Sequence, residues 1–147
     1  MKLRRQLLDL PKYDTIDRVI FMAGIYEPNA CNKIDIEKAK QIIDINLTGA
    51  INIVHYYLPF LEKQNKSQLI LCAASVAEHS GLLNGQPYST TKAAILNLAE
   101  SLKIEYLNSA LDIKVINPGF VKTRLTGKNK FKNAIYYRTR RGGKRNS

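Results

Sequence analysis

The chain has 147 residues, enough for one domain, and 45% of them are hydrophobic, a composition typical of a globular rather than a disordered protein. It contains no apolar run of about 18 residues, the length a membrane-spanning helix needs, and its N-terminal region lacks the apolar stretch of a secretory signal. The net charge of +11 suggests a nucleic-acid-binding protein, but residues 1–121 hold 13 basic and 12 acidic side chains, whereas residues 122–147 hold ten basic ones and no acidic one. The positive charge belongs to the C-terminal segment, which argues against nucleic acid as a partner of the folded body.

The two cysteines, Cys31 and Cys72, show no spacing typical of a metal site. They could form one disulfide, but a reduced cysteine in the core is the commoner arrangement in a chain without a secretory signal. We therefore expect a cytoplasmic protein with no membrane contact and no bound metal.

Three short apolar runs, residues 19–23, 69–74 and 113–117, predict β-strands buried on both faces. Helical periodicity follows the first run over residues 37–61 and the second over residues 87–107. In the first helix the apolar positions are Ile43, Leu47, Ala50, Ile51, Val54 and Leu58. The order strand–helix–strand–helix–strand predicts an α/β domain with a parallel sheet.

The second predicted helix opens with Tyr88 and Lys92, which lie four residues apart and so share one face. The ordinary pKa of a tyrosine, about 10, is too high for efficient proton transfer at neutral pH. A neighbouring ammonium would favour the phenolate and lower that pKa. A tyrosine and a lysine four residues apart are also common on helix surfaces. The alternative interpretation is therefore that Tyr88 and Lys92 are an ordinary exposed pair.

Other polar or small residues gather near the predicted strand ends, where ligands of open parallel sheets bind. Ala23 and Gly24 close the first strand, and Ser75 follows the second. Asn117 ends the third strand and is followed by Pro118, Gly119, Val121 and Thr123. Asn46 lies inside the first helix, where it could equally be an ordinary surface residue.

Taken together, these positions resemble the short-chain dehydrogenase/reductase family over residues 15–126. In that family an Asn-Ala-Gly turn ends the fourth strand, an Asn lies in the next helix, a Ser ends the fifth strand, and Tyr-x-x-x-Lys opens the helix after it. The resemblance implies a partial, doubly wound Rossmann-like fold, in which three parallel strands with helices correspond to strands four to six and the first half is absent.

The resemblance also implies roles in the NAD- or NADP-dependent interconversion of a small-molecule carbonyl and an alcohol. Tyr88 would be the acid/base, Lys92 would lower its pKa and hold the nicotinamide ribose, Ser75 would bind the substrate oxygen, and Asn46 would anchor a water of the proton relay. The cofactor-binding set it implies is Ala23, Gly24, Tyr88, Lys92, Pro118, Gly119, Val121 and Thr123.

The chain departs from the family in two ways. Met22 replaces the Asn of the Asn-Ala-Gly turn, and no Gly-rich G-x-x-x-G-x-G loop is present to hold the cofactor pyrophosphate. Right-handed crossovers would place both helices on one face of the sheet, leaving the other face bare and the strand at residues 19–23 with an open edge. We therefore expect dinucleotide binding and activity to be impaired in this chain alone.

Residues 127–147 form a basic segment distinct from the partial domain at 1–126. It is interpreted either as a disordered tail or as the product of a frameshift, because an AT-rich back-translation from Asn133 gives a helix-like sequence in the next frame. Two further hypotheses are a non-catalytic remnant whose tail binds acidic partners, and a chain completed by a separately encoded N-terminal half that supplies the nucleotide site. A homo-oligomer is also a candidate assembly.

Overall fold

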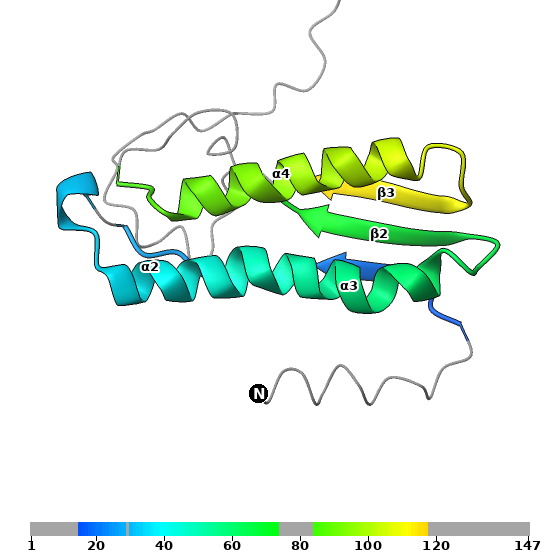
Figure 1. The fold of residues 1–147 in the computed structure, drawn as a ribbon, viewed down its shortest axis with the longest axis horizontal. Coiled ribbons are helices and arrows are strands. Elements are labelled where there is room, and N and C mark those ends of the chain that lie inside the picture. Colours follow the sequence, from blue (N-terminus) through cyan, green and yellow to red (C-terminus); the bar gives the residue numbers. More distant parts are fainter. Residues whose placement is uncertain (1–14, 29, 74–83, 118–147) are drawn as a thin grey trace, which may run out of the picture.

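A computed structural model describes residues 15–28, 30–73 and 84–117, which form a parallel sheet packed against long helical segments (Figure 1). The strands lie in chain order, β1 (Arg18–Phe21), β2 (Ser67–Cys72) and β3 (Leu111–Ile116). Val19 pairs with Leu69, which pairs in turn with Ile113. The predicted α/β class and the parallel sheet are confirmed, although each strand begins and ends one or two residues earlier than predicted.

The predicted helix at residues 37–61 is one helical rod interrupted by a wide turn. A short 3₁₀ helix, η1 (Cys31–Lys33), precedes α2 (Ile36–Ile43), the π-helical turn η2 (Asp44–Thr48) and α3 (Gly49–Leu61). In the wide turn the Gly49 N–H donates to the Asp44 carbonyl five residues earlier. Such π turns often occur at functional sites, and this one contains Asn46.

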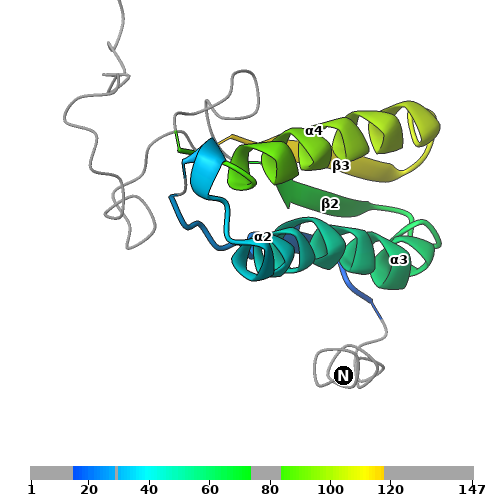
Figure 2. The same ribbon diagram turned by 60° about the vertical axis from the view of Figure 1, so that its left-hand side comes forward.

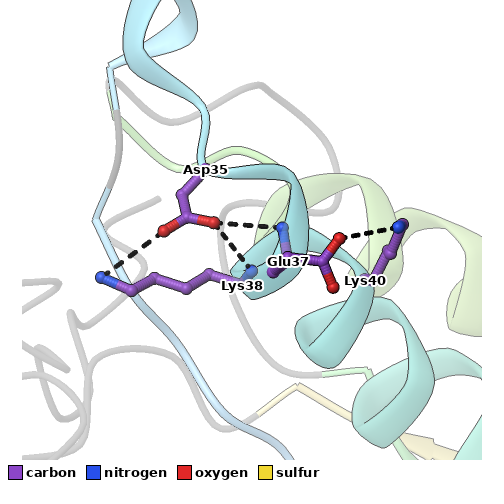
Figure 3. Close-up of polar contacts among 4 residues, drawn as sticks. All are labelled: Asp35, Glu37, Lys38 and Lys40. Atoms are coloured by element: carbon purple, nitrogen blue, oxygen red, sulfur yellow. Dashed lines mark hydrogen bonds and ion pairs between the residues drawn. The ribbon is translucent and has the colours of Figure 1, made fainter.

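Asp35 fixes the start of this rod. Its Oδ1 accepts the backbone N–H groups of Glu37 at 3.0 Å and Lys38 at 3.2 Å, which would otherwise lack partners at a helix N-terminus (Figure 3). Glu37 also pairs with Lys40 at 2.8 Å on the exposed side of the same turns. The rod therefore begins at a defined residue, which sets the position of Asn46 further along it.

The second helix, α4 (Tyr88–Glu105), lies beside α3 along one face of the sheet (Figures 1 and 2). α3 contacts β1 and β2, and α4 contacts β2 and β3. One buried cluster joins both helices to alternate strand residues, and it includes Leu61, Leu69, Leu71, Ile95, Ala99, Leu102, Leu111 and Ile113. The prediction that both helices cover the same face is confirmed.

No helix of the described residues covers the other face. A polar row crosses its amino-terminal end, where Arg18 Nε donates to Gln68 Oε1 at 2.7 Å and Gln68 Nε2 donates to Asp112 Oδ2 at 2.9 Å. Toward the carboxyl end the row gives way to exposed apolar side chains, Ile20 and Ile116. Within the described ranges β1 is an edge strand, as predicted.

The predicted apolar stripe of the first helix is partly wrong. Ile43 and Ile51 are exposed, whereas the inward line consists of Ile42, Asn46 and Ala50. The apolar pattern alone missed this line because its central residue is polar.

The two cysteines are not joined to each other, since Cys31 is exposed and Cys72 is buried at the end of β2. The expected core position holds for Cys72 only. No helix within the described ranges is long and apolar enough to cross a membrane.

Candidate active site

Tyr88 and Lys92 lie in the first turns of α4, on its buried side. Lys92 Nζ is 5.5 Å from the centroid of the Tyr88 ring and donates to the Cys72 carbonyl at 3.3 Å. Because Cys72 is the last residue of β2, the pair lies at the carboxyl end of the central strand. The predicted shared face is confirmed, and the alternative of an exposed surface pair is wrong.

Asn46 is fully buried and holds the segment that follows β1. Its Oδ1 accepts the Ile25 N–H at 2.8 Å, and its Nδ2 donates to the Ile25 carbonyl at 3.0 Å. Nδ2 also donates to Thr91 Oγ1, at 3.2 Å, in the first turn of α4. The interpretation of Asn46 as a helix-surface residue is therefore wrong.

Gly24 completes the group from the end of β1. A Cβ placed there would lie 3.4 Å from Asn46 Oδ1 and 3.5 Å from Lys92 Nζ. A Cβ would therefore make ordinary van der Waals contacts, and its absence leaves a space of about one methyl group beside the two polar groups. Ala23, also predicted to bind cofactor, is exposed next to it.

The surroundings of Tyr88 favour its neutral form. Burial raises the pKa of Tyr88 to about 12, and the nearby ionisable Cys72 and Tyr26 side chains add to the rise. Tyr26 packs against it with ring centroids 5.0 Å apart and an interplanar angle of 68°. Burial and these two neighbours set the net direction, so a lowering by the Lys92 ammonium over the ring stays a prediction.

The remaining predicted site residues lie outside the described residues: Ser75, Pro118, Gly119, Val121 and Thr123. Two residues at the site were missed from the sequence, Tyr26 and Thr91. Thr91 could have been found, since the i+3 position from Tyr88 shares the face of Tyr88 and Lys92. Tyr26 could have been found as a large aromatic residue just beyond a strand end.

This geometry agrees with the result of a family comparison. The family model described as short chain dehydrogenase matches residues 9–134 of the chain. The chain belongs to the short-chain dehydrogenase family. Its oxidoreductase ancestry and its Rossmann-like fold, both predicted from the sequence, are thereby confirmed.

The matched part of this short-chain dehydrogenase covers only about half of each of its relatives. An uncharacterized oxidoreductase of Myxococcus xanthus is 31% identical over 116 residues, which cover 79% of this chain and 46% of the relative. The solved structure of serine dehydrogenase from Escherichia coli has a TM-score of 0.74 at 25% identity, covering 81% of this chain and 56% of that one. A closed form of serine dehydrogenase complexed with NADP⁺ has a TM-score of 0.73 at 24% identity, covering 80% and 48%. The chain therefore spans about half the length of these proteins.

Proposed function

We propose that this short-chain dehydrogenase uses Tyr88 as the acid/base in an NAD(P)-dependent interconversion of a carbonyl and an alcohol. The observation that carries the proposal is the buried grouping of Tyr88, Lys92, Asn46 and Gly24 at the carboxyl ends of β1 and β2. Ligands of open parallel sheets bind at this edge. The grouping joins three segments that are distant in the sequence, which a chance Tyr–Lys pair would not require.

The chemistry divides among residues of the chain. In carbonyl reduction Tyr88 donates its phenolic proton to the substrate oxygen, and in alcohol oxidation it removes the proton from that oxygen. At neutral pH Tyr88 carries the phenolic proton that carbonyl reduction consumes, and its raised pKa makes it a weaker acid than an ordinary tyrosine. Ser75 is proposed to hydrogen-bond the substrate oxygen, and Asn46 to hold a water that returns protons to the site.

The residues present fit the nicotinamide end of a dinucleotide. Gly24 leaves room beside Asn46 and Lys92, and the Lys92 ammonium can donate to ribose hydroxyls. Ala23, Pro118, Gly119, Val121 and Thr123 are proposed to complete the contacts. A bound nicotinamide would supply or accept the hydride.

The adenosine and pyrophosphate end has no such match, because the 147 residues contain no Gly-rich phosphate loop. We therefore propose that the chain alone is impaired. The partner that could complete it is a separate segment with a Gly-rich strand–helix unit, which would bind the sheet face that no helix of the described residues covers; a second copy in a homo-oligomer is a further proposed partner. Proposed assignments also include a cytoplasmic location and the division into residues 1–126 and a basic segment at 127–147.

The experiment has two arms. Calorimetric titration of the purified chain with NADH and NADPH is expected to show no micromolar binding, and such binding would contradict the proposed impairment. In the second arm the DNA flanking the reading frame is sequenced, any Gly-rich βαβ segment is joined in frame, and nicotinamide-dependent turnover is assayed with ketones and aldehydes. A joined protein that binds NADPH but turns over none of these substrates would contradict the catalytic proposal.

The alternative, a non-catalytic protein whose basic segment binds acidic partners, rests on the ten basic side chains of residues 122–147. Binding of this kind would weaken steeply with salt.

A further inference from the structure

A continuous chain of hydrogen bonds runs through the site and includes a residue with no role in the proposed mechanism. Asn46 holds both backbone groups of Ile25, and its Nδ2 donates to Thr91 Oγ1 at 3.2 Å. Thr91 Oγ1 in turn donates to the Tyr88 carbonyl at 2.7 Å. Thr91 is 1% exposed, so water does not compete for these bonds. These hydrogen bonds link the segment after β1, the π turn and the first turn of α4.

The direction of each bond in this chain is fixed by its two backbone ends. The Ile25 N–H can only donate and the Ile25 carbonyl can only accept, so the Asn46 amide has one allowed orientation. The Tyr88 carbonyl can only accept, so the Thr91 hydroxyl must direct its proton there. The oxygen of that hydroxyl can then accept a hydrogen bond from Asn46 Nδ2. Among side chains of similar size, only threonine and serine carry a hydroxyl that can donate one hydrogen bond and accept another.

We propose that Thr91 is a positioning residue that locks Asn46 to the turn carrying Tyr88, and this inference rests on the proposed function of Tyr88. Through Thr91, the loop at Gly24 and the start of α4 share one rigid connection. The acid/base is thereby held at a fixed place relative to Gly24, the residue proposed to lie beside the nicotinamide.

Two neighbours in the same turn provide matched controls. Ser89 is buried like Thr91, but its hydroxyl has no hydrogen-bond partner within the described part of the chain. Thr90 is exposed, and its Oγ1 donates to Gln86 Oε1 at 2.5 Å. Removing either hydroxyl changes the turn without breaking the link between Asn46 and Tyr88.

The first test uses the unaltered 147-residue chain and needs no variant. In nuclear magnetic resonance spectra both side-chain amide protons of Asn46 are expected to exchange slowly with solvent, since one is bonded to the Ile25 carbonyl and the other to Thr91. If either proton exchanges as fast as that of the exposed Asn97, the link is absent and the proposal is overturned.

The second test compares variants of Thr91. Thr91→Val keeps the shape but loses the hydroxyl, and it is expected to speed exchange of the Asn46 amide and of the Ile25 N–H at least about 10-fold. Thr91→Ser is expected to restore slow exchange, and Ser89→Ala and Thr90→Val to leave it unchanged. Equal exchange in Thr91→Val and the unaltered chain would overturn the proposal.

The third test separates this inference from the proposed function, and it uses the joined protein described above. Thr91→Val is expected to lower kcat about 10-fold with little change in KM, because the acid/base is misplaced rather than lost. Thr91→Ser is expected to recover kcat. If the joined protein has no activity, the proposed function fails while the exchange measurements still decide the role of Thr91. If kcat is unchanged in Thr91→Val, the positioning role is overturned.

Discussion

The Lys92 ammonium lies over the ring of Tyr88, 5.5 Å from its centroid, and is held there by its hydrogen bond to the Cys72 carbonyl. At this distance a cation is attracted to the face of a neutral aromatic ring. The bond to the end of β2 ties the position of the cation to the sheet as well as to the helix. A buried positive charge and a neutral phenol therefore coexist in the site.

Replacing Tyr88 with Phe is expected to lower turnover by about 10²- to 10⁴-fold in the joined protein, since it removes the proton donor and preserves the ring. Steady-state rates with a panel of carbonyl substrates provide the measurement. Tyr106→Phe is a matched control, because Tyr106 lies beyond the other end of α4 and donates to Glu62 at 2.6 Å. Equal turnover of the Tyr88→Phe variant and the parent would show that the resemblance to the family is limited to the fold.

The raised pKa of Tyr88 predicts a loss of stability at alkaline pH. A tyrosine in the unfolded chain loses its proton near pH 10, whereas folded Tyr88 keeps its proton until about pH 12. Between these values the unfolded state binds fewer protons, so the free energy of unfolding falls as the pH rises. This difference corresponds to about 2 kcal/mol of lost stability at pH 12.

Urea unfolding at about pH 9 and about pH 11 measures this loss. The Tyr88→Phe variant is expected to lose distinctly less stability over the same interval, because its ring has no titrating group. If parent and variant lose equal stability, Tyr88 titrates at its ordinary pKa and is not buried as described.

Asn46→Asp is expected to lower the free energy of unfolding at neutral pH by at least about 1–3 kcal/mol. A buried carboxylate has no N–H to donate to the Ile25 carbonyl and to Thr91 Oγ1. Urea denaturation midpoints provide the measurement. Asn97→Asp is the matched control, since Asn97 lies exposed on α4. The difference between the two variants is expected to shrink in acid, where protonation of the introduced carboxylate gives it one O–H that can donate a hydrogen bond. A difference that grew in acid would argue against this origin.

Self-association is expected from the sheet face that no helix of the described residues covers, rather than from the helices. Ile20 on β1 and Ile51 on α3 are almost equally exposed, at 50% and 48%, but lie on opposite sides of the sheet. Sedimentation analysis is expected to show oligomers of the parent chain and a shift toward monomer in Ile20→Lys, with little shift in Ile51→Lys. A shift in Ile51→Lys alone would place the association on the helical side instead.

The parts of the fold that follow simple periodicity could be predicted from the sequence. Continuous apolar runs located all three strands to within two residues, and the right-handed crossover rule placed both helices on one face. The inward line of the first helix could not be predicted in this way. Ile43 and Ile51 continue the apolar pattern but are exposed, because the wide turn rotates a different line of residues inward.

The sequence predicted which residues form the candidate site more fully than it predicted the protonation and hydrogen bonding of those residues. The Tyr–Lys spacing, Asn46 and Gly24 could be found because the family resemblance depends on residue types at fixed separations. The pKa of Tyr88 depends on how much water the folded chain excludes, and no spacing in the sequence encodes that quantity. Thr91 could have been found from its spacing to Tyr88, but its bond to Asn46 could not, since that bond joins residues 45 positions apart.

The wide turn determines what would follow if the helical rod lost one residue. Ala50 lies eight positions after Ile42, whereas two regular helical turns take about 7.2 residues. The π turn absorbs this excess, so that Ile42, Asn46 and Ala50 all point inward. A version shorter by one residue between Ile42 and Ala50 would still align those two ends in an ordinary α-helix. The one extra residue that the π turn accommodates is therefore dispensable for hydrophobic packing. Its deletion would instead turn the polar amide of Asn46, midway along the rod, away from the inward side.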